Sequence, residues 1–207
     1  MDSKAEIELC IADLRESVLK IAEEWSREEL GVSARTLVID AKRIHELREV
    51  FDVVLITGFS LPHFCPWDVL ELFAAVTEIL PDKGILVLEE NDRRYSIFLR
   101  AGYRSVLVEK AENNSVVLSV HSRYDPVRGT IQRVHFDFLK NEACIIDTFF
   151  WGLSELMGFL WVFFRDIDIV WVTRTYGFIL AREPRRKLSI KDFEKKPRVL
   201  AMTRQIP

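Results

Sequence analysis

Near the middle of the chain, apolar residues form continuous runs on either side of a segment in which they recur at helical spacing. Residues 51–57 (FDVVLIT) and 85–89 (ILVLE) are almost continuously apolar, which is typical of strands buried on both faces of a parallel sheet. Between them, residues 67–80 carry apolar side chains at steps of three and four, which predicts a helix with Pro66 in its first turn. This strand–helix–strand order predicts two neighbouring parallel strands, both buried, with the helix packed on one face of the sheet.

The first part of the chain leaves two interpretations open. Apolar residues within 4–30 recur at helical steps, which suits one amphipathic helix, but residues 7–12 also alternate, which suits a short strand before a shorter helix. Gly31 ends the helix in either case as a C-terminal cap. Residues 35–40 are rich in β-branched side chains and predict a strand, and residues 41–50 predict a short polar helix or turn.

The chain changes character after Glu90. Three β-rich runs separated by turn sequences predict an antiparallel meander, namely residues 116–121, 131–138 and 143–149. An apolar helix and a terminal pair of strands are then expected over residues 154–164, 167–172 and 176–181. The apolar stretch at 149–164 is shorter than the roughly 20 residues that span a bilayer, so a buried helix is expected and no membrane partner.

Charge and cysteine content narrow the function classes. The net charge is −3, which does not indicate a nucleic-acid-binding protein as a whole. Lys and Arg are concentrated after residue 183, so residues 184–207 are expected to form a basic tail that is either a solvated surface segment or an RNA contact. Cys10, Cys65 and Cys144 are far apart and odd in number, which indicates a reducing, cytoplasmic compartment.

Residues 51–90 resemble the second half of a class I, Rossmann-like S-adenosylmethionine-dependent methyltransferase. The resemblance is carried by FDVVLITGFSLPHF, WDVLELFAAVTEIL and PDKGILVLEE, and it continues in FFWGLSELMGFLWVFF, IDIVWV and TYGFILARE, which match the family's last helix and terminal strand pair. It implies one α/β domain over residues 1–183, with a mostly parallel sheet, helices on both faces, a terminal antiparallel pair and the meander inserted at about 91–149 over the substrate pocket.

The same resemblance implies S-adenosylmethionine as the cofactor and places its contacts. Asp40, followed by Ala41, matches the acidic residue that faces the adenine in the family, and Asp13 falls at or near the ribose-binding carboxylate. The loop of Thr57, Gly58 and Phe59 matches the loop beside the cofactor and the substrate. Open α/β sheets bind their ligands at the carboxyl ends of the strands, where these residues are expected.

No catalytic group stands out, and the methyl acceptor is not identified. His63 is a candidate for a general base, since histidine titrates near neutral pH, and an exposed loop histidine is the alternative. His63 and Cys65 lack further ligands for zinc, so no metal site is predicted. Arg93 and Arg94 either bind an acidic substrate or lie in a solvated loop. Three tryptophans are assigned to the core, namely Trp151, Trp161 and Trp171.

One feature departs from the family pattern. The family's first strand and its GxGxG-like loop precede the position of Ile7, where this chain has MDSKAE without a glycine. We therefore expect either an N-terminally shortened methyltransferase, inactive as this chain, or a relative that repacks the gap, and in both cases weak binding of S-adenosylmethionine or none. Methyl transfer competes here with a second function, that of a non-catalytic methyltransferase-like binding or partner subunit.

Overall fold

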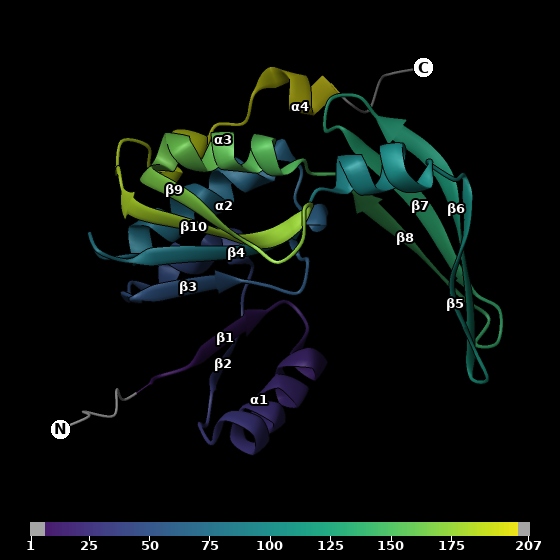
Figure 1. Ribbon diagram of the computed structural model, residues 1–207, viewed down its shortest axis with the longest axis horizontal. Helices are drawn as coiled ribbons and strands as arrows, with labels where there is room; N and C mark the ends of the chain where they lie inside the picture. The colour runs from purple at the N-terminus through teal and green to yellow at the C-terminus, as the bar shows by residue number, and fades with distance from the viewer. Residues whose placement is uncertain (1–6, 203–207) are drawn as a thin grey trace. The chain divides into compact units, whose positions relative to one another are not determined.

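The chain divides into two units, each with its own sheet structure. A computed structural model describes residues 7–202 (Figure 1). The first unit is Met1–Glu49, and the second is Val50–Pro207. The first contains a two-stranded sheet, and the second contains two four-stranded sheets.

The N-terminal unit consists of a short strand, a helix and a second strand. Its elements are β1 (Cys10–Asp13), α1 (Glu16–Leu30), β2 (Arg35–Val38) and the 3₁₀-helix η1 (Ala41–Leu47). Strands β1 and β2 are parallel, with Cys10 opposite Arg35, and α1 connects them. Gly31 ends α1 in the left-handed conformation at φ 67°, as a residue without Cβ can do at little cost. Of the two interpretations of residues 4–30, the strand-plus-helix one is therefore confirmed over residues 7–30, and residues 4–6 lie outside the described residues.

The second unit is built on a four-stranded sheet in the order β3-β4-β10-β9. Its elements are β3 (Val53–Ile56), α2 (Pro66–Ile79), β4 (Ile85–Asn91), α3 (Leu153–Phe163), β9 (Phe164–Trp171) and β10 (Tyr176–Pro184). Strands β3 and β4 are parallel neighbours, with Val53 opposite Ile85, which confirms the predicted strand–helix–strand unit. Strand β10 is antiparallel to both β4 and β9, so the predicted terminal pair is also confirmed.

The expectation of a mostly parallel sheet with helices on both faces is only partly met. In the second unit one ladder of this sheet is parallel and two are antiparallel. Helices α2 and α3 lie on the same face (Figure 1), where Phe73 and Phe163 pack edge to face. Leu86 and Leu88 are fully buried beneath them, whereas Val53 and Leu55 on β3 are exposed. The expectation that both strands are buried on two faces is wrong for β3, because the helices of this unit cover one face.

The second sheet of this unit is the antiparallel meander. It contains four strands in the order β5-β6-β7-β8, which are β5 (Val106–Glu112), β6 (Ser115–Asp125), β7 (Thr130–Asp137) and β8 (Glu142–Thr148). The antiparallel arrangement is confirmed, but the sequence predicted three strands and not β5. The ladder of β5 shifts register between Val108 and Lys110, and this bulge interrupts the alternation on which the prediction depended.

The basic segment after residue 183 folds back onto helix α2. It forms the 3₁₀-helix η4 (Ile190–Phe193) and the short helix α4 (Arg198–Met202). The guanidinium of Arg186 donates to the carbonyl oxygens of Thr77 and Leu80 at 3.2 and 2.7 Å. Carbonyls at a helix C-terminus lack helical partners and carry partial negative charge, so they favour such a cation. Among the described helices, none is long and apolar enough to cross a bilayer.

Candidate functional site

The carboxyl ends of β3 and β4 are joined by the side chain of Glu89. Its two carboxylate oxygens accept from the backbone N–H of Gly58 at 2.8 Å and from the hydroxyl of Tyr176 at 2.7 Å. The carboxylate raises the pKa of Tyr176, since a proton shared with an anion is harder to remove. Glu89 therefore connects the loop after β3, the end of β4 and the start of β10.

The turn after β3 presents an aromatic face beside an open backbone. Gly58 and Phe59 both have positive φ, at 70° and 55°, and a Cβ on Gly58 would meet no atom within 4 Å. The centroid of the Phe59 ring lies 5.7 Å from that of Tyr176, and the guanidinium of Arg93 lies 5.5 Å from the centroid of the Phe59 ring. A flat ligand group could stack on this ring while another part approaches the backbone of Gly58 closely.

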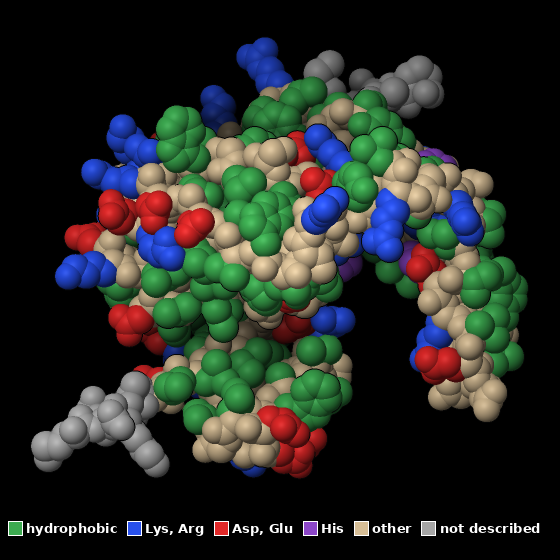
Figure 2. Space-filling view, in the orientation of Figure 1, with side chains coloured by type: hydrophobic (Ala, Val, Ile, Leu, Met, Phe, Trp, Pro, Cys, Tyr) green, Lys and Arg blue, Asp and Glu red, His purple; other side chains and the backbone are tan. Residues whose placement is uncertain are grey.

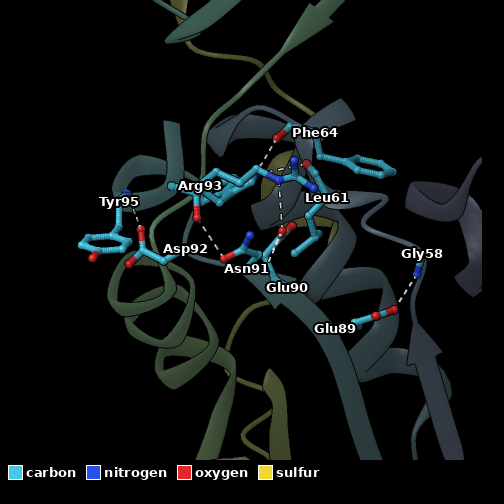
Figure 3. Close-up of polar contacts among 11 residues, drawn as sticks. Gly58, Leu61, Phe64, Glu89, Glu90, Asn91, Asp92, Arg93 and Tyr95 are labelled. Atoms are coloured by element: carbon cyan, nitrogen blue, oxygen red, sulfur yellow. Dashed lines mark hydrogen bonds and ion pairs between the residues drawn. The ribbon is translucent and has the colours of Figure 1, made fainter. Parts of the chain in front are cut away.

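An ion pair between a buried glutamate and a partly exposed arginine lies at the C-terminal end of β4 (Figure 3). Glu90 is 0% exposed, and its Oε1 accepts from Arg93 at 3.0 Å and from the N–H of Asn91 at 2.9 Å. Its Oε2 has no hydrogen-bond partner within residues 7–202. Burial raises the pKa of Glu90, and the charge of Arg93 opposes this shift. Arg93, whose side chain is 24% exposed, is therefore part of a half-buried network rather than of a solvated loop.

Trp151 fixes the middle of the loop that follows β3. Its indole N–H donates to the carbonyl oxygens of Leu61 and Phe64, each at 3.1 Å. Its own carbonyl accepts from the N–H of Arg93 at 2.9 Å. Trp151 is fully buried, as predicted, but Trp161 and Trp171 are exposed, so their assignment to the core is wrong.

The remaining predicted residues of this edge are Thr57, His63 and Cys65. Thr57 and His63 are exposed, and the imidazole of His63 makes no contact with a described polar or charged group that would activate it as a base. The thiol of Cys65 donates to Asp68 at 2.9 Å, and burial raises its pKa. Within the described residues, no three His, Cys, Asp or Glu side chains gather in a way that could hold a metal ion.

Asp13, Asp40 and Ala41 lie at the carboxyl end of the parallel pair in the N-terminal unit. Both oxygens of Asp13 accept from Arg15, at 3.0 and 3.2 Å, and this contact lowers the pKa of the carboxyl. Asp40 caps η1 by accepting from the N–H of Lys42 at 2.9 Å, and Ala41 is the first residue of η1. The two aspartates thus share one sheet edge, and each already has a local structural role. The expected first strand and glycine-rich loop concern residues 1–6, which lie outside the described residues.

The root of the meander, at Val127 and Phe149, lies beside the loop that follows β3. The indole N–H of Trp67 donates to the carbonyl of Val127 at 3.0 Å, and the N–H of Phe149 donates to the carbonyl of Pro62 at 2.8 Å. The expectation that the meander lies at the carboxyl edge of the parallel strands is therefore confirmed (Figure 1). Whether it covers a substrate there stays a prediction.

A second polar network lies inside the meander and was missed in the sequence. Arg133 is buried and donates to the hydroxyl of Ser119 at 2.8 Å and to that of Tyr103 at 3.1 Å. Tyr103 is also 2.5 Å from Nδ1 of His121, and Ser119 hydrogen-bonds Glu109. An arginine at an inward position of a strand was the available signal, because a guanidinium is buried only with partners.

Comparisons with known proteins identify the fold. No protein-family model matches the sequence, and no curated protein sequence matches it. Solved structures do match. An S-adenosylmethionine-dependent methyltransferase from Clostridium acetobutylicum ATCC 824 aligns with a TM-score of 0.62 at 13% identity, over 84% of this chain and 74% of that one. The CcbJ methyltransferase from Streptomyces caelestis aligns with a TM-score of 0.64 at 14% identity, over 86% and 75%.

A third match is a structure that contains the cofactor. S-adenosylmethionine-bound CalS10, an amino pentose methyltransferase from Micromonospora echinaspora involved in calicheamicin biosynthesis, aligns with a TM-score of 0.51 at 15% identity. It covers 85% of this chain and 74% of its own. The chain therefore has the fold of class I methyltransferases. At such identities the likeness concerns the fold, which hosts more than one function.

Proposed function

We propose that this chain is an S-adenosylmethionine-dependent methyltransferase that acts on an acceptor not yet identified. The observation that carries the proposal is the methyltransferase fold over 84% of the chain. The carboxyl edge of β3 and β4 adds to it, because this is where open α/β sheets bind ligands. The three unpaired cysteines further support a reducing compartment such as the cytoplasm.

The described residues at this edge fit one side of the cofactor. The exposed ring of Phe59 offers a stacking surface for the adenine, and the open backbone at Gly58 allows close approach. The carboxylate of Glu89 provides negative charge at the same turn, which favours a cationic ligand. The cofactor supplies a methyl group activated by a sulfonium. The protein's part is to orient the acceptor and exclude water, and the meander root lies where it could do so. The roles of Asp13, Asp40, Ala41 and Thr57 stay proposals from the resemblance.

Binding is expected to be weak. The eight glycines are spread along the chain and form no glycine-rich turn for the methionine part of the cofactor. A charged amino acid moiety without partners loses much of the affinity that the adenine contact provides. We expect a dissociation constant weaker than about 10 μM, which corresponds to about −7 kcal/mol.

Ligand-observed NMR and calorimetric titration test this proposal. S-adenosylmethionine and S-adenosylhomocysteine should bind, ATP should not, and Phe59→Ala should weaken both complexes. Tyr124→Ala, which removes an exposed aromatic ring of the meander, is the control. Absence of binding at millimolar cofactor would refute the proposal and favour the non-catalytic subunit. Micromolar binding would leave the proposal standing and show that the expected weakness is wrong.

A further inference from the structure

One face of the meander is apolar on all four strands. The register places Val108 opposite Leu118, Leu118 opposite Phe136, and Phe136 opposite Ala143. In the next row the pairs are Val106 with Val120, Val120 with Val134, and Val134 with Ile145. Side chains of alternate residues share a face of a sheet, so these eight residues form one surface. We call this set the meander apolar face: Val106, Val108, Leu118, Val120, Val134, Phe136, Ala143 and Ile145.

This surface is open to solvent in the single chain. Val106, Val108, Phe136 and Ile145 are 39–65% exposed, and Phe138 extends the patch beside the ring of Phe136. Figure 2 shows hydrophobic side chains along the outer side of the meander. These five side chains alone expose on the order of 500 Å² of apolar area. Monomeric proteins rarely expose contiguous apolar patches much above a few hundred Å², so the surface is suited to being covered.

The opposite face of the meander is different and already has partners. It carries the buried network of Ser119, His121 and Arg133. A sheet that is satisfied on one face and bare on the other has half of a sandwich core, because two sheets pack face to face about 10 Å apart. The surface that would cover the bare face and complete this sandwich core is a second flat, uncharged sheet face.

We propose that the meander apolar face is the interface of a twofold symmetric dimer of this chain. A second copy offers the same flat and uncharged surface, and a twofold axis brings the two together without leaving an open face for further growth. The exposed area of the five side chains, with the half-buried members of the face and its rim, approaches the ~800 Å² per partner of a standard interface. The proposal does not depend on methyl transfer.

The charges around the face favour a protein partner over a lipid surface. They are of both signs: Lys110 pairs with Glu112 at 2.9 Å, Lys140 pairs with Asp137 at 3.7 Å, and the exposed Arg123 lies opposite Gln132. Towards the root, Asp147 accepts from Gln132 at 3.2 Å. Peripheral membrane-binding surfaces are rimmed by unpaired Lys and Arg that meet anionic headgroups. This rim, as described, carries no such excess of positive charge.

The test is the mass of the whole chain in solution, measured by sedimentation velocity and by light scattering after gel filtration. The wild-type chain should have twice the 24.2 kDa of one copy. Val108→Lys and Ile145→Lys should each raise the dimer dissociation constant at least about 100-fold, since each places two charges in the symmetric interface. The matched control is Cys144→Lys, which adds the same charge at the neighbouring exposed residue on the opposite face and should leave the dimer intact.

Circular dichroism of each variant shows whether it remains folded. A wild-type chain that is monomeric at about 100 μM overturns the proposal without any variant, since weaker association lies outside the range of specific interfaces. A dimer that survives both face variants also overturns it, because the interface then lies elsewhere. Wild-type chain that stays monomeric and sediments with anionic vesicles would assign the face to a membrane instead.

Discussion

Replacing Trp151 by Phe should destabilise the second unit strongly. The change removes the N–H that serves the carbonyls of Leu61 and Phe64 at 3.1 Å, and it leaves Phe149, whose ring lies 4.4 Å away, with less to pack against. The carbonyl of Leu61 keeps the N–H of Phe64 at 2.9 Å, so the carbonyl of Phe64 is the one that loses its donor among the described residues. This loss and a small cavity together cost about 2–4 kcal/mol. Urea unfolding followed by circular dichroism at 222 nm measures the loss as a fall in the transition midpoint.

The matched control is the same substitution at an exposed tryptophan. Trp161 is 63% exposed and packs against the guanidinium of Arg185, so Trp161→Phe should change stability by no more than about 1 kcal/mol. If the two variants lose equal stability, the role assigned to the Trp151 hydrogen bonds is wrong. A loss below about 1 kcal/mol for Trp151→Phe would mean that the loop finds other partners for its carbonyls.

Two further predictions concern a buried charge and two glycines. The pKa of Glu90 is raised in the folded state, so its contribution to stability is present below its unfolded pKa and is lost as the pH rises through its folded pKa. Lowering the pH from about 7 to about 5 should therefore raise the free energy of unfolding of the wild type more than that of Glu90→Gln in parallel urea titrations, and equal changes would contradict the effect of burial. Gly177→Ala should lower the free energy of unfolding by at least about 2 kcal/mol, because its Cβ would lie 2.5 Å from the carbonyl oxygen of Val170. Gly158→Ala, in open space on α3, should raise it by about 1 kcal/mol in thermal unfolding, and a Gly177→Ala variant more stable than Gly158→Ala would show that the backbone at Gly177 moves to make room.

The elements that the sequence predicted correctly are those whose signal is local. The run of residues 51–57 and the helical spacing of 67–80 are each complete within a few turns of chain, so the amino-acid pattern alone is enough to place β3, α2 and β4. Strand β5 was missed because its bulge breaks the alternation that identifies a half-buried strand. Whether helices cover one face of the β3-β4-β10-β9 sheet or both depends on where the helices pack, and the pattern of apolar residues does not determine this.

The candidate site was predictable only in part, for the same reason. Gly58 and Phe59 were identified through the resemblance to the methyltransferase loop that follows an apolar strand. The role of Glu89 was missed, since its partner Tyr176 lies 87 positions later and the two meet only when β10 pairs with β4. The internal network of Arg133 likewise depends on the register of β6 and β7, which no local pattern fixes.

The loop that follows β3 is held by contacts from three distant parts of the chain. Glu89 on β4 accepts from Gly58, Trp151 before α3 donates to the middle of the loop, and Phe149, directly after β8, donates to Pro62. Few of these groups are neighbours in sequence, so the loop acquires its shape only after the sheet, the last helix and the meander have assembled. Since Phe149 and Trp151 lie one residue either side of Phe150, a displacement of the meander root would move two of the three attachments together. The geometry at Gly58 and Phe59 is therefore a property of the whole second unit, and substitutions far from this turn are expected to alter it.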